Sequence, residues 1–169
     1  MKKYILAFII SCITLNFYAQ ESSPSTYYFI RHAEKDRSDK TNKNPELTEK
    51  GNNRAKNWSI VFENVDFDLI YSTKYNRTIQ TAEPTATKQN LEIQYYSPSH
   101  LNDEDFKLKT NGKTVLVVGH SNTTPQFVND ILGDLKYSDI DDKNNANLYV
   151  LTILGKTKNC VLIKVPYKK

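Results

Sequence analysis

Two residue pairs, Arg31-His32 and Gly119-His120, carry the side chains best suited to chemistry on an anion. Each pair directly follows a short run of β-forming residues, a pattern typical of buried parallel strands. In open α/β sheets, ligands bind at the carboxyl ends of such strands. We therefore expect both histidines to lie at one edge of a sheet, where this architecture places its ligand.

An arginine beside a histidine indicates a nucleophile in a site for an anion. A guanidinium group presents paired donors that match phosphate oxygens, and an imidazole forms covalent intermediates when its second nitrogen is held. The run Ser72–Arg77 follows a further predicted strand and brings a second arginine to the same edge. Two imidazoles and two guanidinium groups would together form a pocket for a phosphate dianion.

A metal site made of His32, His120 and an acidic residue is the competing chemistry. The sequence lacks the His-Glu-x-x-His spacing and the paired cysteines of zinc sites. Two nearby arginines would also repel a divalent cation. We therefore expect neither a metal nor another cofactor.

The elements that must position these residues alternate between strand-like and helix-like patterns. The sequence predicts strands at 26–31, 68–72, 91–96, 113–118, 147–154 and 160–165, and helices from Thr48, at about 75–89 and at 123–132. Thr48 is a plausible N-cap, and Pro84 should bend the second helix or lie in a break. Segments 33–45, 98–111 and 138–145 are polar and predict loops, the second with one helical turn.

This order of elements predicts an α/β fold, a three-layer α/β/α sandwich with a mostly parallel central sheet. The last two strands should form a hairpin. A chain of 169 residues suits one domain. Its net charge of +4 is too small, and its basic residues too scattered, to indicate a nucleic-acid partner.

Residues 1–19 have the pattern of a signal peptide, which leaves 20–169 as the folded domain. Lys2 and Lys3 precede an apolar stretch, and Ala19 offers a small residue for cleavage. The apolar stretch is shorter than the about 20 residues of a membrane-spanning helix. We expect a periplasmic or secreted protein that has no membrane contact after cleavage. An uncleaved anchor and lipidation at Cys12 are the alternatives.

The motifs around the chemical residues resemble the histidine phosphatase superfamily, the phosphoglycerate-mutase-like clan, over nearly the whole chain after the leader. The chain is compact, like the small phosphohistidine phosphatases of that family. The matching blocks are Ile30-Arg31-His32-Ala33-Glu34, Leu47-Thr48-Glu49-Lys50-Gly51, Tyr71-Ser72, Arg77-Thr78-Ile79-Gln80-Thr81-Ala82 and Val118-Gly119-His120-Ser121.

The resemblance implies a role for each matching residue. His32 would be the nucleophile that accepts the phosphoryl group. Arg31, Arg77 and His120 would bind the phosphate and stabilise its charge in the transition state. Ser72 is a candidate phosphate ligand, although a turn or cap role is the alternative.

Many family members also supply a carboxylic acid that protonates the leaving group. Asp103 occupies the best-matching position here, and Glu104 is next. Either could instead cap a helical turn. A site without a dedicated acid is the third possibility, as in the small phosphohistidine phosphatases.

The combined reading is an exported phosphatase that hydrolyses phosphomonoesters through a phosphohistidine on His32. Its expected partner is a small phosphorylated substrate or a phosphate ion, and the sequence indicates no particular oligomeric state. The alternatives are a phosphohistidine-protein phosphatase or mutase, and a non-catalytic phosphate-binding module. Residues 89–114 leave little room for a cap domain, so the open pocket fits a mutase poorly.

Overall fold

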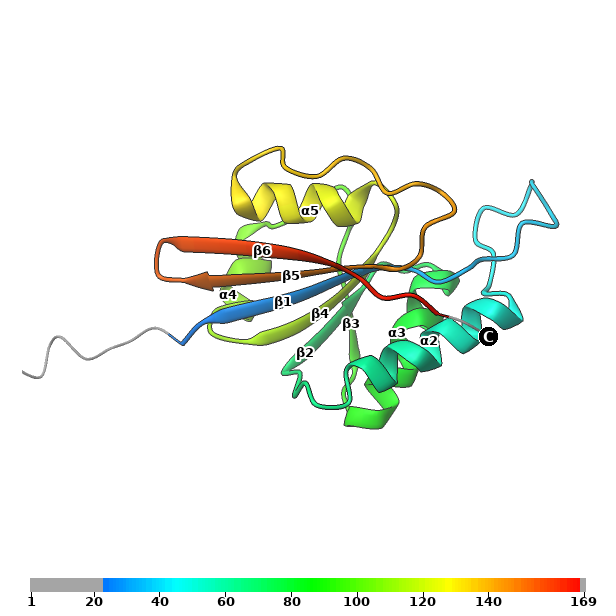
Figure 1. Ribbon diagram of the computed structural model, residues 1–169, viewed down its shortest axis with the longest axis horizontal. Helices are drawn as coiled ribbons and strands as arrows, with labels where there is room; N and C mark the ends of the chain where they lie inside the picture. The colour runs from blue at the N-terminus through cyan, green and yellow to red at the C-terminus, as the bar shows by residue number, and fades with distance from the viewer. Residues whose placement is uncertain (1–22, 168–169) are drawn as a thin grey trace, which may run out of the picture.

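The computed structural model describes residues 23–167, and Figure 1 shows one sheet with helices on both of its faces. The predicted signal peptide falls on residues 1–22 and so lies outside the described residues. The strands are β1 (Ser25–Arg31), β2 (Leu69–Ser72), β3 (Ile93–Tyr95), β4 (Thr114–Gly119), β5 (Asn147–Leu154) and β6 (Thr157–Lys164). The helices are α2 (Glu49–Val61), α3 (Asn76–Gln89), α4 (Glu104–Thr110) and α5 (Thr123–Leu132).

The sheet has six strands in the order β3-β2-β4-β1-β5-β6. Strands β3, β2, β4 and β1 are parallel, whereas β5 runs antiparallel to β1 and pairs with β6 as a hairpin. The expected mostly parallel sheet and its terminal hairpin are therefore confirmed. Because Arg31 is in register with Gly119, β1 and β4 end at the same level.

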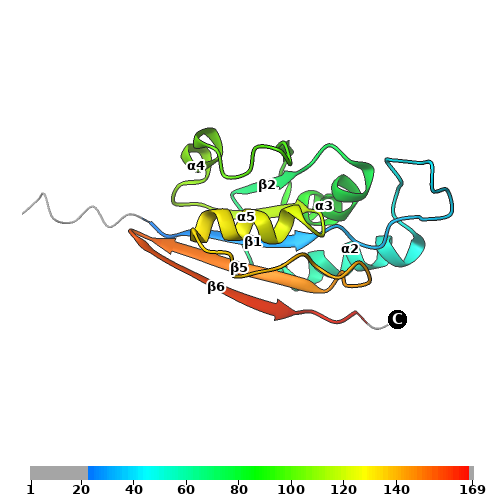
Figure 2. The ribbon, with the colours of Figure 1, turned by 90° about the horizontal axis from the view of Figure 1, so that it is seen from above.

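Two apolar cores, one on each face of the sheet, make the molecule three layers thick. Helices α2 and α3 cover one face, where Trp58 and Phe62 belong to the same cluster as Ile30. Helices α4 and α5 lie on the other face, where Phe106 and Phe127 belong to the same cluster as Phe29. Figure 2 shows α5 in front of strand β1. Successive side chains of a strand point to opposite faces, so central β1 is buried on both sides. The predicted α/β/α sandwich is confirmed.

Local sequence signals explain where the helices begin and end. The Oγ1 of Thr48 accepts a hydrogen bond from the Gly51 backbone N–H at 3.1 Å, so Thr48 is the N-cap of α2 as expected. Gly51 is required there because a Cβ would lie 2.2 Å from the Glu34 carbonyl oxygen. Helix α3 continues through Pro84 without a break. Ala82 and Ala86, on either side of Pro84, are both buried in the α2–α3 core.

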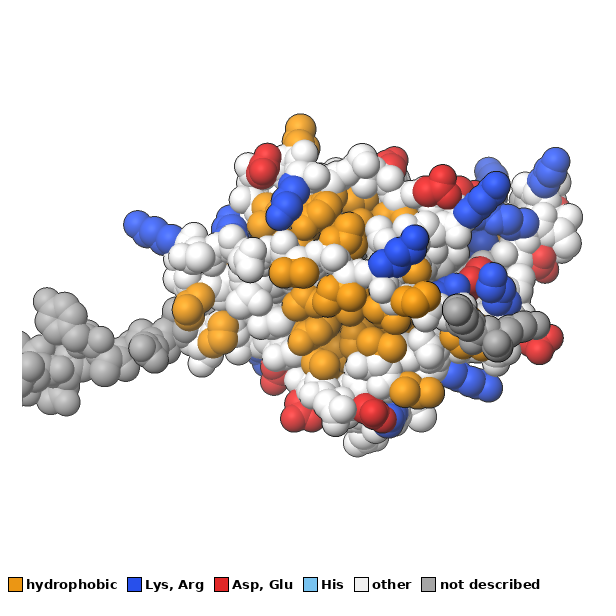
Figure 3. Space-filling view, in the orientation of Figure 1, with side chains coloured by type: hydrophobic (Ala, Val, Ile, Leu, Met, Phe, Trp, Pro, Cys, Tyr) orange, Lys and Arg blue, Asp and Glu red, His pale blue; other side chains and the backbone are white. Residues whose placement is uncertain are grey.

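Strand β6 forms one edge of the sheet and is only partly covered. Figure 3 shows apolar side chains gathered over the β5–β6 region, where Val161 and Ile163 are 52% and 43% exposed. Cys160 points to the opposite face, is buried as predicted, and its thiol pKa is raised by that burial. Within residues 23–167, each helix is too short or too polar to cross a membrane.

Candidate active site

The parallel pairing of β1 and β4 brings the two predicted histidines together. The backbone N–H of His32 donates to the Gly119 carbonyl at 2.9 Å, which extends the β1–β4 ladder by one residue. The imidazole rings of His32 and His120 lie 5.7 Å apart, centroid to centroid. Two residues separated by nearly ninety positions therefore share one site because their strands are neighbours.

A cavity of about 310 Å³ opens at this edge of the sheet. Four of the predicted site residues line it: Arg31, His32, Arg77 and His120. The other lining residues come from the loops that follow β1, β2, β3 and β4, from the start of α5 and from the loop before β5: Lys35, Tyr75, Pro98, Ser121, Asn122, Thr123 and Asp142.

The contacts of His32 assign its tautomer. Its Nδ1 lies 2.7 Å from the backbone oxygen of Ala33, so Nδ1 carries the hydrogen and Nε2 keeps a lone pair. The pKa of His32 is lowered to about 3. Burial is the largest cause, and the charges of Arg31 and Arg77 act in the same direction, whereas the hydrogen bond to Ala33 opposes them. His32 is therefore a neutral imidazole at neutral pH, with a free nitrogen available for attack.

Arg31 is almost completely buried and is held by the loop before β5. Its Nη1 donates to the carbonyl oxygens of Asp141, Asp142 and Asn144 at 2.8, 3.1 and 3.0 Å. Its Nη2 donates to the Asp142 carboxylate at 2.8 Å. The Nε of Arg31 is buried and has no hydrogen-bond partner within the described residues. The loop thus fixes the guanidinium plane and leaves one N–H uncommitted.

Arg77, from the first turn of α3, has more uncommitted donors. Its guanidinium lies 4.4 Å from the ring centroid of Tyr75, and its Nη2 lies 3.4 Å from Nδ1 of His120. Its Nε and Nη1 are buried and have no partner among residues 23–167. Burial lowers the pKa of Arg77, and the charge of Arg31 adds to the effect. Buried donors without partners are rare in folded proteins, and an oxyanion that reached these donors would form charge-assisted hydrogen bonds with them.

His120 is oriented by a chain of threonines that the sequence analysis missed. Its Nε2 lies 3.0 Å from the Oγ1 of Thr73, which lies 2.9 Å from the Oγ1 of Thr78. The Thr78 hydroxyl donates to backbone carbonyls, so Thr73 donates to Thr78 and accepts from the His120 Nε2–H. Burial, followed by the charges of Arg77 and Lys35, lowers the pKa of His120 to about 4.

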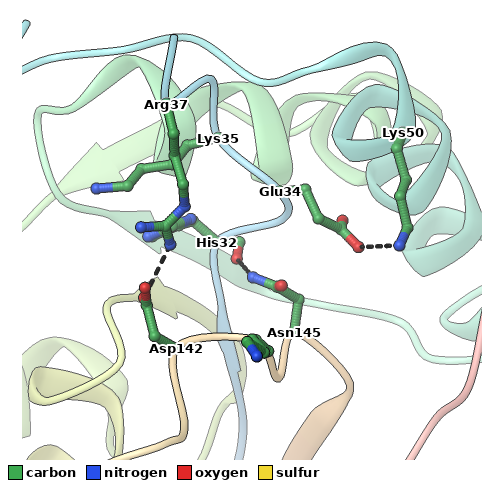
Figure 4. A pocket seen from close by; sticks show the side chains of 8 residues that line it. His32, Glu34, Lys35, Arg37, Lys50, Asp142 and Asn145 are labelled. Carbon is green, nitrogen blue, oxygen red and sulfur yellow. Dashed lines mark hydrogen bonds and ion pairs between the residues drawn. The ribbon is translucent and has the colours of Figure 1, made fainter. Parts of the chain in front are cut away.

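The buried Thr73 directly follows strand β2, and that position was the only available signal for its role. Asn145 was missed as well. It is buried, and its Nδ2 donates to the His32 carbonyl at 2.8 Å, as Figure 4 shows. Both residues support a histidine through contacts between segments that are distant in sequence.

The remaining predicted residues lie away from the cavity. Ser72 is fully buried, and its hydroxyl donates to the Thr73 carbonyl at 3.0 Å. Asp103 is the N-cap of α4, where it accepts from the Phe106 N–H at 2.8 Å. Glu104 is exposed and pairs with Lys107. Asp103 therefore has the cap position that was its alternative, whereas Ser72 is the last residue of strand β2 and neither turns nor caps the chain.

The carboxylate that does line the cavity, Asp142, is not suited to donate a proton. Hydrogen bonds from Arg37 and Arg31, both at 2.8 Å, lower its pKa to about 2. Asp142 is therefore ionised at neutral pH. Within residues 23–167, no three His, Cys, Asp or Glu side chains are grouped as metal ligands would be.

Comparison with known proteins finds a family match for part of the sequence and solved structures with the same fold. The sequence model of the histidine phosphatase superfamily (branch 1) matches residues 27–98, which contain Arg31, His32 and Arg77. A search of curated proteins gave no match.

Solved structures with the same fold include phosphatases and a mutase. A protein assigned as the phosphohistidine phosphatase SixA from Agrobacterium tumefaciens is 19% identical, with a TM-score of 0.61 over 82% of this chain and 97% of its own. A mycobacterial glucosyl-3-phosphoglycerate phosphatase is 13% identical, with a TM-score of 0.62 over 84% of this chain and 98% of its own. The phosphoglycerate mutase from Bacillus anthracis is 14% identical, with a TM-score of 0.63 over 85% of this chain and 94% of its own.

The TM-scores of these structures show a common fold, and the family match over residues 27–98 adds the sequence signature around the first histidine. The resemblance seen in the sequence is thereby confirmed: this chain has the phosphoglycerate-mutase-like fold and carries the signature of the histidine phosphatase superfamily.

Proposed function

We propose that this chain is a phosphatase that hydrolyses phosphomonoesters through a phosphohistidine on His32. The family match and the SixA-like fold support a phosphatase or mutase. The observation that carries the finer proposal is the arrangement of two side chains. His32 keeps a free Nε2 because Ala33 holds its Nδ1–H, and Arg77 lines the same cavity with unpaired donors.

The first step forms a bond between Nε2 of His32 and phosphorus and breaks the bond to the leaving-group oxygen. Phosphoryl transfer depends mainly on positioning and on electrostatic stabilisation of the equatorial oxygens. The free N–H groups of Arg31 and Arg77 supply that stabilisation. Thr73 holds the Nε2–H of His120, so His120 adds to it when the charge of the bound phosphate draws a proton onto Nδ1. In the second step, water attacks the phosphohistidine, inorganic phosphate leaves, and Nε2 regains its lone pair.

The low pKa of His32 suits this role. A protonated imidazole has no lone pair with which to attack phosphorus, and burial keeps His32 neutral down to about pH 3. Once the phosphoryl group is attached, its negative charge lies among the cations that disfavoured a proton there. The same cationic surroundings thus favour both the free nucleophile and the intermediate.

The carboxylate that lines the cavity, Asp142, does not protonate the leaving group, because it is ionised. Leaving groups that need little protonation, such as phenols, would depart most easily from this site. A phosphorylated histidine on another protein is such a substrate, because an imidazole is a better leaving group than an alkoxide. Phosphohistidine-protein phosphatase activity is therefore the second candidate function.

A mutase fits the structure less well. Between α3 and β4 the chain forms only short β3, seven-residue α4 and their loops, so this segment builds no cap over the cavity. A mutase must retain its intermediate and exclude water while the substrate reorients.

We also propose export to the periplasm or outside the cell, on the signal-peptide pattern of residues 1–19. N-terminal sequencing of the purified full-length product tests it, and a product that still begins at Met1 contradicts it.

Hydrolysis of para-nitrophenyl phosphate tests the proposed function. We expect wild-type turnover and a loss of about 1,000-fold or more in kcat for His32→Gln, since no other group replaces the nucleophile. His100→Gln is the matched control, because His100 is exposed and lies outside the cavity. Turnover retained in His32→Gln contradicts the proposal. Phosphate binding without turnover in the wild type would instead support a non-catalytic phosphate-binding module.

A further inference from the structure

A second cavity, of about 330 Å³, adjoins the proposed phosphate site. The two cavities share His32, Lys35 and Asp142. The second one extends from His32 toward the loop after β1 and the loop before β5, as Figure 4 shows. It lies beside the nucleophile, where the remainder of a bound phosphoester could extend.

Both carboxylates that line this second cavity are already neutralised by arginines. The two oxygens of Glu34 accept from Arg54, each at 2.8 Å, and Lys50 lies 3.6 Å from one of them. Asp142 is shared between Arg31 and Arg37. Each carboxylate is therefore already paired with two cations.

Two lysines remain whose charges are not balanced. Lys35 and Lys143 both line the cavity, and neither forms an ion pair within residues 23–167. Lys35 is partly buried, and its pKa is lowered by burial and by the charges of Arg77 and Arg37, an effect that the charge of Asp142 opposes without cancelling. An ammonium group in that position gains from any anion that enters, because the anion relieves both effects.

We propose that this second cavity is an anion subsite, and that the substrate is a phosphomonoester whose leaving group carries a second phosphate. The inference rests on the proposed phosphatase function. One phosphate would lie against His32, Arg31 and Arg77, and the other against Lys143. Lys35 lines both cavities, so it would lie between the two phosphates.

The excess of positive charge around the second cavity favours this substrate class over a neutral one. A neutral leaving group would leave both lysines unpaired, the partly buried Lys35 and the exposed Lys143. A second phosphate would form charge-assisted hydrogen bonds with them, which are about twice as strong as neutral ones. The cavity is also comparable in volume to the phosphate cavity, at about 330 against about 310 Å³.

A matched pair of aryl substrates tests the subsite. We would compare kcat/KM for 1,4-phenylene bisphosphate, halved for its two equivalent phosphates, with kcat/KM for 4-hydroxyphenyl phosphate. We expect the wild type to favour the bisphosphate by about tenfold or more, the effect of one hydrogen bond to a charged group. Lys143→Met should lower that ratio to about threefold or less. Lys156→Met removes the same charge at the exposed β5–β6 turn and should leave the ratio unchanged.

Each result bears on one of the two proposals. Equal kcat/KM for the two wild-type substrates, or a preference that survives Lys143→Met, overturns the subsite while the phosphatase stands. If neither substrate is hydrolysed, the phosphatase proposal fails. In that case, calorimetry of the same two compounds with wild type and Lys143→Met tests the subsite. The ratio of the two Kd values should then show the same preference for the bisphosphate in the wild type and the same loss of it in Lys143→Met.

Discussion

Replacing Arg77 by methionine should abolish phosphate binding and leave the folded protein nearly as stable as before. In most proteins, removing a half-buried arginine from the first turn of a helix costs stability. Here Nε and Nη1 of Arg77 are buried without partners within the described chain, and Arg31 adds repulsion. The free protein therefore gains little from this side chain.

The contacts of Arg77 set the size of the expected change. A fully buried unsatisfied donor costs about 1–3 kcal/mol. Arg77 is only half-buried, so solvent screens its charge. Removing its two unsatisfied donors should therefore stabilise the free protein by about 1 kcal/mol. Loss of the stacking on Tyr75 costs about 0.5–1 kcal/mol. The two effects oppose each other, so the free energy of unfolding should change by less than about 1 kcal/mol.

Arg54→Met is the matched control and should behave in the opposite way. Arg54 is also a helical arginine, 7% exposed, but its Nε and Nη2 each donate to Glu34 at 2.8 Å. Removing it leaves the half-buried Glu34 with Lys50 as its remaining ion-pair partner. We expect a loss of about 1–3 kcal/mol in the free energy of unfolding. Phosphate binding should remain, because Arg54 does not line the phosphate cavity.

Urea unfolding with and without inorganic phosphate measures both effects. Phosphate at 100 times its Kd should stabilise wild type and Arg54→Met by about 2.7 kcal/mol. It should not stabilise Arg77→Met. If Arg77→Met lost more than about 2 kcal/mol without phosphate, or kept the full stabilisation by phosphate, the assignment of its unpaired donors to an anion would be refuted.

Three further changes test other parts of the site. Asp103→Ala should lower the free energy of unfolding by about 1 kcal/mol through loss of the α4 cap and leave kcat for aryl and alkyl esters unchanged; a selective loss with alkyl esters would restore Asp103 as the general acid. Thr73→Val should lower kcat by about tenfold with little change in KM, because His120 loses the hydroxyl that holds its Nε2–H; an unchanged kcat would show that this contact is dispensable. The lowered pKa values of His32 and His120, to about 3 and about 4, mean that the unfolded chain binds more protons below pH 6.5, so stability should fall as the pH drops from about 6.5 toward 4. Urea unfolding of wild type and His32→Gln at pH 7 and pH 5 checks this, and a wild type as stable at pH 5 as at pH 7 would contradict it.

The sequence was sufficient to predict the strands and to place four of the side chains that line the cavity, those of Arg31, His32, Arg77 and His120. Strands β1 and β4 are short apolar runs followed at once by Arg-His or Gly-His, so the strand and its functional residues are read from adjacent positions. The N-cap of α2 at Thr48 was predictable for the same reason. Pro84 was expected to bend helix α3 or to lie in a break; the break was wrong, because buried residues on both sides of Pro84 keep α3 continuous against the local preference of proline.

The supporting contacts could not be predicted because they join distant segments. Thr73 meets His120 across 47 positions, and Asn145 meets His32 across 113. Asp103 was ambiguous because an aspartate before a short helix fits both a general acid and an N-cap. The second cavity arises where the loop after β1 meets the loop before β5, and neither loop has a periodic pattern that would place it.

The position of the phosphoryl group on histidine tests the central claim most directly. The protein would be labelled with ¹⁵N-histidine, mixed with an aryl phosphate, quenched without acid and examined by ³¹P and ¹⁵N NMR. We expect an acid-labile phosphorus bonded to Nε2 of His32, because Ala33 holds Nδ1 as a donor. Phosphorus on Nδ1, on another residue, or on none while turnover continues would contradict the account.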